Sequence, residues 1–148
     1  MDKRGFTLLE LLMVLGITTI IIFFTLSISL STRRDERILL DQYIHMIAND
    51  IIYAKEYAIA NNVTLVFLVD SKNKRYLVYR GNFILLEQKL PDDYEIRGIF
   101  ANVHSSFTIS NLGYVDRFGS ITISNKYGEI RRITITIKTG RVKVMLDD

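Results

Sequence analysis

Residues 3–30 read KRGFTLLELLMVLGITTIIIFFTLSISL, which is a short basic leader followed by a long apolar run. Glu10 is the only charged residue between Arg4 and Arg33. A carboxylate at the centre of a bilayer costs roughly 2.5–3.5 kcal/mol on insertion scales, and less near the interface. Because the chain keeps an acidic residue in so apolar a segment, we take Glu10 as the first candidate functional residue.

Residues 11–31 supply about 20 uncharged positions, the length that a helix needs to cross roughly 30 Å of hydrocarbon. A secretory signal peptide would have an apolar core of about 7–15 residues and a small-x-small cleavage site. This run is longer, and its candidate site is Ser29-Leu30-Ser31. A plain single-pass anchor fits the length, and Lys3 and Arg4 would place its N-terminus in the cytoplasm. That interpretation leaves Glu10 unexplained.

A third interpretation accounts for the leader, the apolar run and the acidic residue together. The segment Lys3–Glu10 resembles the prepilin cleavage motif of type IV pilins and of the pseudopilins of type II secretion and competence systems. The resemblance implies that a prepilin peptidase in the membrane cuts between Gly5 and Phe6 and methylates the new N-terminus at Phe6. It also implies that the mature chain joins other pilins in a filament through their N-terminal helices.

Each residue of this motif has a physical reason to be there. Gly5 lacks a Cβ, so its backbone can enter a narrow protease cleft. Lys3 and Arg4 hold the leader at the anionic cytoplasmic face of the membrane. Cleavage creates an amine at Phe6, one helical turn from Glu10. The resemblance implies that Glu10 pairs with the Phe6 ammonium of a neighbouring subunit, so that wrong registers leave both charges unpaired. The alternative is a carboxylate that reaches the headgroups from near the helix end.

The apolar run is expected to continue as one long helix. After the charged residues 33–37, one helical stripe comprises Leu40, Ile44, Ile47, Ile51, Ala54 and Ala58. Five residues are expected to widen it, namely Leu39, Tyr43, Met46, Tyr53 and Tyr57. The pattern predicts a helix from Phe6 to Asn61, roughly 80–85 Å long at 1.5 Å per residue. We assign residues 6–31 to the membrane or filament core and residues 32–62 to an amphipathic continuation.

Short strands are predicted beyond this helix, at residues 63–69, 75–79, 82–87, 94–97, 106–110, 120–123, 130–137 and 141–145. Ile133, Ile135 and Ile137 alternate with polar residues, which predicts a strand with one buried face. Thr139-Gly140 predicts a hairpin turn. The fold class is therefore α+β, with a leader at residues 1–5 and a long helix packed on one antiparallel sheet system, which forms the β domain at residues 63–148.

A second pattern lies in the β domain, in the segments FTISNLG (107–113), GSITI (119–123), ITI (133–135) and TGRV (139–142). These segments resemble the C-terminal pattern of H-type minor pseudopilins, and within that group the ComGD-type competence minor pilins of Gram-positive bacteria. The resemblance implies a cell-surface pilus that draws DNA to the cell, with the precursor in the cell membrane and its N-terminus in the cytoplasm. Two alternatives stay open: a type II secretion pseudopilin, and a membrane-anchored extracellular binding domain that never polymerises.

Composition argues against an enzyme. The 148 residues include no cysteine, which excludes disulfides and thiolate chemistry. His45 has Asp41 and Asn49 at helical spacing, but such a group is typical of a solvated helix face. His104 precedes Ser105 without a nucleophile elbow. We therefore predict no catalytic residue, no metal site and no cofactor.

Basic residues near the C-terminus raise the question of DNA binding. The set is Lys126, Arg131, Arg132, Lys138, Arg141 and Lys143, with Tyr114 and Tyr127 nearby in sequence. Phosphate attraction combined with ring stacking is the usual mechanism of sequence-independent strand binding. The alternative is a solvated strand face that discourages edge pairing. The net charge of +3 is too small to decide between them.

Overall fold

This computed structural model describes residues 8–146, and their side chains except those of residues 26–34, 103 and 146. The chain divides after Arg37 into two compact units. Helix α1 (Leu8–Ala60) is 53 residues long and contributes to both units. The predicted long helix is thus confirmed over this range, and its first two predicted positions, Phe6 and Thr7, lie outside the described residues.

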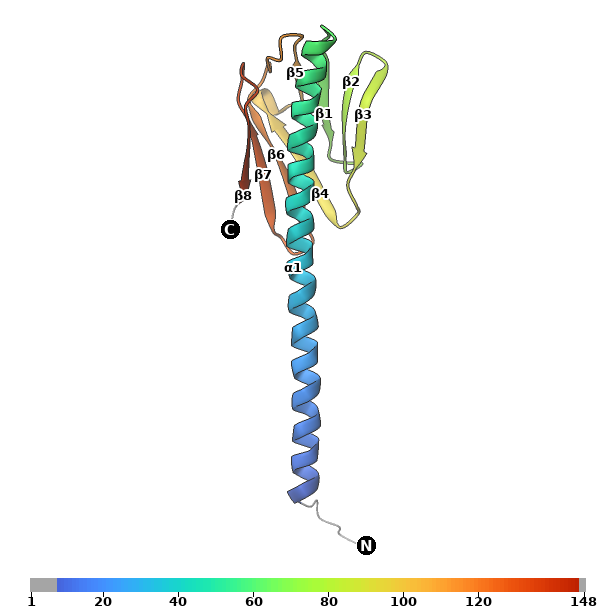
Figure 1. Ribbon diagram of the computed structural model, residues 1–148, viewed down its shortest axis with the longest axis vertical. Coiled ribbons are helices and arrows are strands. Elements are labelled where there is room, and N and C mark those ends of the chain that lie inside the picture. Colours follow the sequence, from blue (N-terminus) through green and yellow to red (C-terminus); the bar gives the residue numbers. More distant parts are fainter. Residues whose placement is uncertain (1–7, 147–148) are drawn as a thin grey trace. The chain divides into compact units, whose positions relative to one another are not determined.

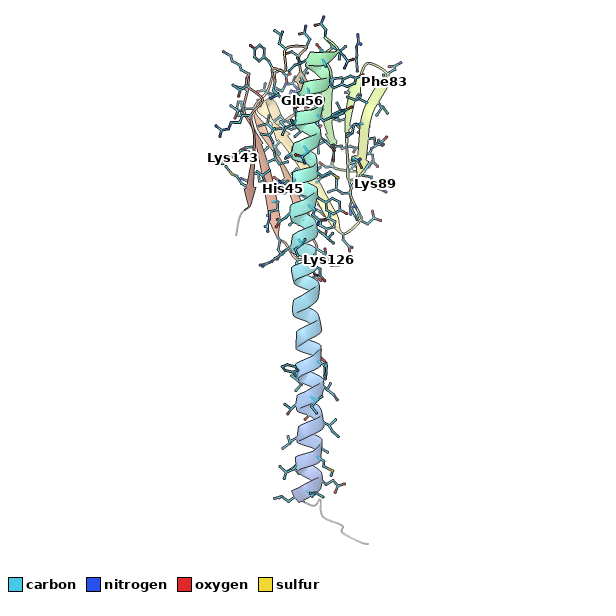
Figure 2. The ribbon with its side chains drawn as sticks, in the orientation of Figure 1. His45, Glu56, Phe83, Lys89, Lys126 and Lys143 are labelled. Atoms are coloured by element: carbon cyan, nitrogen blue, oxygen red, sulfur yellow. The ribbon has the colours of Figure 1, made fainter. Side chains whose placement is uncertain are left out.

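The second unit contains two antiparallel sheets of four strands each (Figure 1). Its described elements are β1 (Leu65–Asp70), β2 (Arg75–Arg80), β3 (Phe83–Lys89), β4 (Tyr94–Phe100), the short 3-10 helix η1 (Ala101–Val103), β5 (Ser106–Ile109), β6 (Gly119–Asn125), β7 (Ile130–Ile135) and β8 (Val142–Leu146). The first sheet has the order β3-β2-β1-β5, and the second has the order β4-β6-β7-β8. The predicted α+β class is confirmed, although the strands form two sheets where we expected one sheet system.

The C-terminal part of α1 and the inward faces of both sheets share one hydrophobic core. All six residues of the predicted stripe are fully buried: Leu40, Ile44, Ile47, Ile51, Ala54 and Ala58. Tyr43 and Tyr57 pack against the core as expected. Leu39 and Tyr53 do not, because their side chains remain 41% and 48% exposed. The buried face of the helix therefore differs from the predicted one, because it includes Ala48 and excludes Leu39 and Tyr53.

Aromatic rings connect the two sheets within this core. Phe67 and Phe107 stack with ring centroids 5.1 Å apart on neighbouring strands of the first sheet. Phe100 on β4 of the second sheet contacts Phe107 at 4.9 Å. Close to this contact, a Cβ added to Gly98 would lie 2.9 Å from the Cβ of Val69. Glycine at this position therefore allows β4 to approach β1.

Strand β7 ends earlier than the sequence predicted. Ile133 and Ile135 are buried, but Ile137 is 43% exposed and lies outside the strand. The chain leaves the sheet there because Lys138 pairs with Val115 instead: its amide donates to the Val115 carbonyl at 3.0 Å, and its carbonyl accepts from the Val115 amide at 3.3 Å. The alternation of isoleucines therefore overestimated the strand by two residues.

Two polar side chains of α1 bond to elements far away in sequence. The Tyr76 hydroxyl on β2, which is fully buried, donates a hydrogen bond to the Asp50 carboxylate. Burial, together with this hydrogen bond, raises the pKa of Tyr76 above its ordinary value. Lys55 Nζ donates to the carbonyls of residues 139 and 140, at 3.0 Å each. These bonds fix the helix against both sheets.

Candidate functional site

The leader residues of the predicted processing site, Lys3, Arg4, Gly5 and Phe6, lie outside the described residues. Cleavage and methylation there stay predictions. Glu10 lies in the first turn of α1 as described, and it is exposed.

The residues that follow Glu10 form an exposed apolar helix surface. None of the 18 residues Leu8–Thr25 is buried, and the segment is long and apolar enough to cross a membrane. The large exposed side chains are Leu8, Leu9, Leu11, Leu12, Met13, Val14, Leu15, Ile17, Ile20, Ile21, Ile22, Phe23 and Phe24. A helix that is apolar on all sides requires lipid or other apolar helices around it.

The hydroxyl groups within this segment are satisfied by the helix itself. Thr18 Oγ1 donates to carbonyls three and four residues earlier, at 2.9 Å each. Thr19 and Thr25 donate to the carbonyls four residues before them, at 2.7 and 2.8 Å. Back-bonding of this kind removes the cost of placing a hydroxyl in hydrocarbon. The segment can therefore sit in an apolar surrounding without unsatisfied side-chain donors, and α1 continues unbroken through Thr18 and Thr19.

The structure separates the basic residues that the sequence grouped as a DNA-facing patch. The Arg131 side chain is 12% exposed, and its Nε donates to Asp41 Oδ1 on α1 at 2.6 Å. Arg131 therefore fastens β7 to the helix. Arg132 follows it in the strand and so points to the opposite face of the sheet. Lys143 on β8 lies on that same outer face, opposite Thr134.

The remaining residues of that set lie on turns. Lys138 pairs with Val115 through its backbone, and Arg141 follows in the turn between β7 and β8. Lys126 lies in the turn between β6 and β7, where its Nζ pairs with Asp93 at 3.1 Å. The six predicted residues thus occupy several surfaces. Because successive side chains of a strand point to opposite faces of the sheet, Arg131 and Arg132 cannot lie on the same surface.

Comparisons with known proteins agree with this geometry. The family described as "Prokaryotic N-terminal methylation motif" matches residues 1–26. No curated protein sequence matches the chain. The minor pseudopilin EpsH from the type 2 secretion system of Vibrio cholerae superimposes with a TM-score of 0.59, covering 72% of this chain and 96% of EpsH at 12% identity. The type IV minor pilin FimU of Pseudomonas aeruginosa gives a TM-score of 0.57, covering 76% and 91% at 12% identity.

The fold is pilin-like. The pilin-like architecture consists of the long N-terminal helix and the antiparallel sheets on which its C-terminal part packs. At 12% identity the two solved structures establish the fold alone, so the function has to be argued from this chain's own residues.

Within this pilin-like chain, the candidate metal-ligating side chains lie apart in the part that the structure describes. No group of three or more histidine, aspartate or glutamate side chains among them is placed to hold a metal ion. Asp41, which is near His45 on the helix, is engaged by Arg131. The His104 carbonyl accepts from the Phe100 amide at 2.9 Å, which is a structural contact.

Sequence reasoning missed Arg97, which shares the outer face of the second sheet with Arg132 and Lys143. The signal available in the sequence was the alternation in the segment 94–97, where buried Tyr94 and Ile96 imply that Arg97 faces outward. This alternation does not reveal that Arg97 lies beside Arg132 and Lys143, because the sequence does not show which strands pair with β4.

Proposed function

We propose that this chain is a minor subunit of a type IV pilus-like filament, cleaved after Gly5 by a prepilin peptidase and methylated at Phe6. One observation carries the proposal: a helix segment with every residue exposed and apolar nearly throughout is joined to a compact domain of pilin-like fold. The match of residues 1–26 to the methylation motif supports the same conclusion. The precursor is a single-pass membrane protein with its N-terminus in the cytoplasm, and the mature chain reaches the cell surface in the filament.

Glu10 is the residue that we propose for assembly. It is an exposed acidic residue at the beginning of an apolar helix surface. In a bundle of such helices, its carboxylate would be removed from water and would need a cation nearby. The methylated amine of Phe6 on a neighbouring subunit supplies that cation, so Glu10 fixes the axial register between subunits.

Within this role we propose a competence pilus that takes up DNA, as in Gram-positive bacteria. The support is the C-terminal pattern around residues 107–142, which resembles the ComGD-type minor pilins. A type II secretion system is the alternative, and EpsH is a minor pseudopilin of such a system in Vibrio cholerae. Deleting the gene distinguishes them, because loss of transformation supports the competence pilus and loss of enzyme secretion supports the alternative.

Direct contact between this subunit and DNA stays a prediction. After the assignment of Arg131 to an ion pair with Asp41, the candidates for phosphate contact are Arg132, Lys138, Arg141 and Lys143. DNA binding by the full chain should weaken as salt rises if these residues contact phosphates. Absence of binding at low salt would remove this part of the proposal.

The filament proposal is tested by Glu10→Ala and Glu10→Gln in cells that assemble the filament. Both variants should be processed and inserted, because Glu10 lies beyond the predicted cut and a neutral residue is easier to place in lipid. Both should be depleted at least tenfold from sheared filaments, since each removes the charge. Glu36→Gln is a matched control, because Glu36 lies on the same helix beyond the apolar segment.

Normal incorporation of both Glu10 variants would contradict the assigned role of Glu10. Absence of the unaltered chain from sheared filaments, together with an uncut N-terminus, would favour the membrane-anchored binding domain. The two outcomes are separable because processing and incorporation are measured on the same cells, by the mass of the N-terminal peptide and by the filament fraction.

A further inference from the structure

The outer face of the second sheet carries an arrangement of side chains that the filament role so far leaves unused. Strand pairing aligns three rows across β4, β6, β7 and β8. The rows are Glu95, Ser124 and Ile130; Arg97, Thr122, Arg132 and Met145; and Ile99, Ser120, Thr134 and Lys143. Small hydroxyl side chains on β6 therefore lie between arginines on β4 and β7.

The two arginines of the middle row lack carboxylate partners. Three other arginines of this unit are paired: Arg75 with Asp70 and Glu87, Arg117 with Asp116, and Arg131 with Asp41. No such contact exists for Arg97 or Arg132 among the residues that the structure describes. With one strand between them, their backbones are about 10 Å apart. Two guanidinium groups at this spacing can bind two acidic groups.

A hollow of about 530 Å³ lies over this part of the sheet, lined among others by Glu95, Arg97, Thr122, Ser124 and Arg132. The hydroxyl groups of Thr122 and Ser124 add hydrogen-bonding capacity beside the guanidinium groups. Bidentate pairing with a carboxylate uses the planar fork of arginine, which lysine lacks. The site is therefore built to receive acidic groups.

The surroundings of the hollow favour a protein over a nucleic acid as the occupant. Ile99 and Ile130 flank the arginine row and are 52% and 42% exposed, so a partner has apolar surface to cover. Glu95 on the same face opposes a continuous polyanion. None of the side chains in the three rows is aromatic, so the face offers no ring for base stacking. Exposed arginine and apolar side chains together are typical of protein interfaces.

We propose that this face docks an acidic surface of a neighbouring filament subunit, with two carboxylates bound by Arg97 and Arg132 and apolar side chains covering Ile99 and Ile130. The partner's identity as a filament subunit rests on the proposed function above. The contact would act beside the N-terminal helices as a second interface and would select which subunit lies next to this one. Charge complementarity between two surfaces contributes more to the specificity of binding than to its affinity.

The test is photo-crosslinking in cells that assemble the filament, with benzoylphenylalanine placed at Thr122 of the full chain. A second placement at Ser120 covers the case in which the first interferes with folding. We expect a crosslink to another filament protein at a peptide rich in aspartate or glutamate. The double variant R97E/R132E should reduce that crosslink at least tenfold, and R97Q/R132Q should also weaken it. Arg80→Glu is the matched control, because Arg80 is an exposed arginine on the first sheet.

Four outcomes overturn the proposal: no crosslink from either position, a crosslink that survives R97E/R132E, a crosslink to nucleic acid, or a protein partner absent from sheared filaments. The N-terminal mass and the filament content of the same cells test the filament role separately. A chain that is processed and incorporated but gives no crosslink at these positions refutes the docking face and leaves the filament role intact.

Discussion

Both halves of α1 are rich in apolar residues, but among the side chains that the structure describes, those of the C-terminal half alone are buried. From Leu40 to Ala58 the apolar residues recur at steps of three and four, and the stripe is fully buried against two sheets. From Leu8 to Thr25 they occupy every side of the helix, and none is buried. The difference teaches that the first segment depends on an apolar surrounding supplied by lipid or by other subunits, whereas the second depends on its own domain.

The largest expected effect comes from opening a cavity in the buried stripe. Ile51→Ala removes a fully buried side chain and should lower the free energy of unfolding of the domain by about 2–5 kcal/mol. Urea unfolding followed by tyrosine fluorescence measures it. Ile52→Ala is the control, because that neighbouring side chain is 44% exposed. Equal losses from both substitutions would contradict the assigned orientation of the helix.

The ion pair between α1 and β7 should contribute less. Asp41→Ala leaves the guanidinium of Arg131, whose side chain is 12% exposed, without its carboxylate partner. We expect a loss of about 1–3 kcal/mol in the free energy of unfolding. Glu56→Ala, at an exposed site on the same helix, should change stability by less than about 0.5 kcal/mol. An unchanged stability of the Asp41 variant would show that the pair is not formed in solution.

A buried tyrosine gives the domain a pH dependence at alkaline pH. The pKa of Tyr76 is raised in the folded chain by burial and by Asp50, whereas an unfolded tyrosine titrates near roughly pH 10. The stabilisation is therefore fully present below about pH 10 and is lost as the pH rises beyond it. Tyr76→Phe should cost about 1–2 kcal/mol at neutral pH and should flatten the alkaline decline. Tyr114→Phe is the control, because it removes an exposed phenol. If Tyr76→Phe loses stability at alkaline pH as steeply as Tyr114→Phe does, Tyr76 is not the source of the pH dependence.

The smallest effect is expected in the apolar half. Ile17 is 59% exposed, and Ile17→Ala should leave the free energy of unfolding of the domain within about 0.5 kcal/mol of the original value. The same substitution should reduce recovery in sheared filaments, because it removes apolar surface that other helices would cover. If Ile17→Ala lowers the free energy of unfolding as much as Ile51→Ala does, the proposed difference between the two halves of the helix is wrong.

Much of this fold could be predicted from the sequence because its signals are local. The stripe from Leu40 to Ala58 follows helical periodicity, and the alternation in residues 130–135 follows strand periodicity. The division into two sheets could not be predicted, because β4 pairs with β6 rather than with its sequence neighbours, and no local pattern encodes that pairing. The exposure of Ile137 was missed for the same reason, since it depends on the distant pairing of Lys138 with Val115.

The candidate functional residues likewise fall into those that the sequence predicts and those that it does not. Glu10 could be identified because a single acidic residue within an apolar run is visible in the sequence itself. The ion-pair partner of Arg131 could not be identified from the sequence, because Asp41 lies 90 residues earlier in the chain. The outer arginine row likewise combines strands that meet only in the folded sheet.

The N-terminus of the mature chain tests the account most directly. When the full chain is produced together with a prepilin peptidase, mass spectrometry of its N-terminal peptide should show loss of residues 1–5 and a methyl group on Phe6. A Gly5→Val variant should keep the leader, because a branched side chain blocks the approach of the backbone to the protease. Recovery of the unaltered chain with Met1 still attached would contradict the filament role, although the fold would stand.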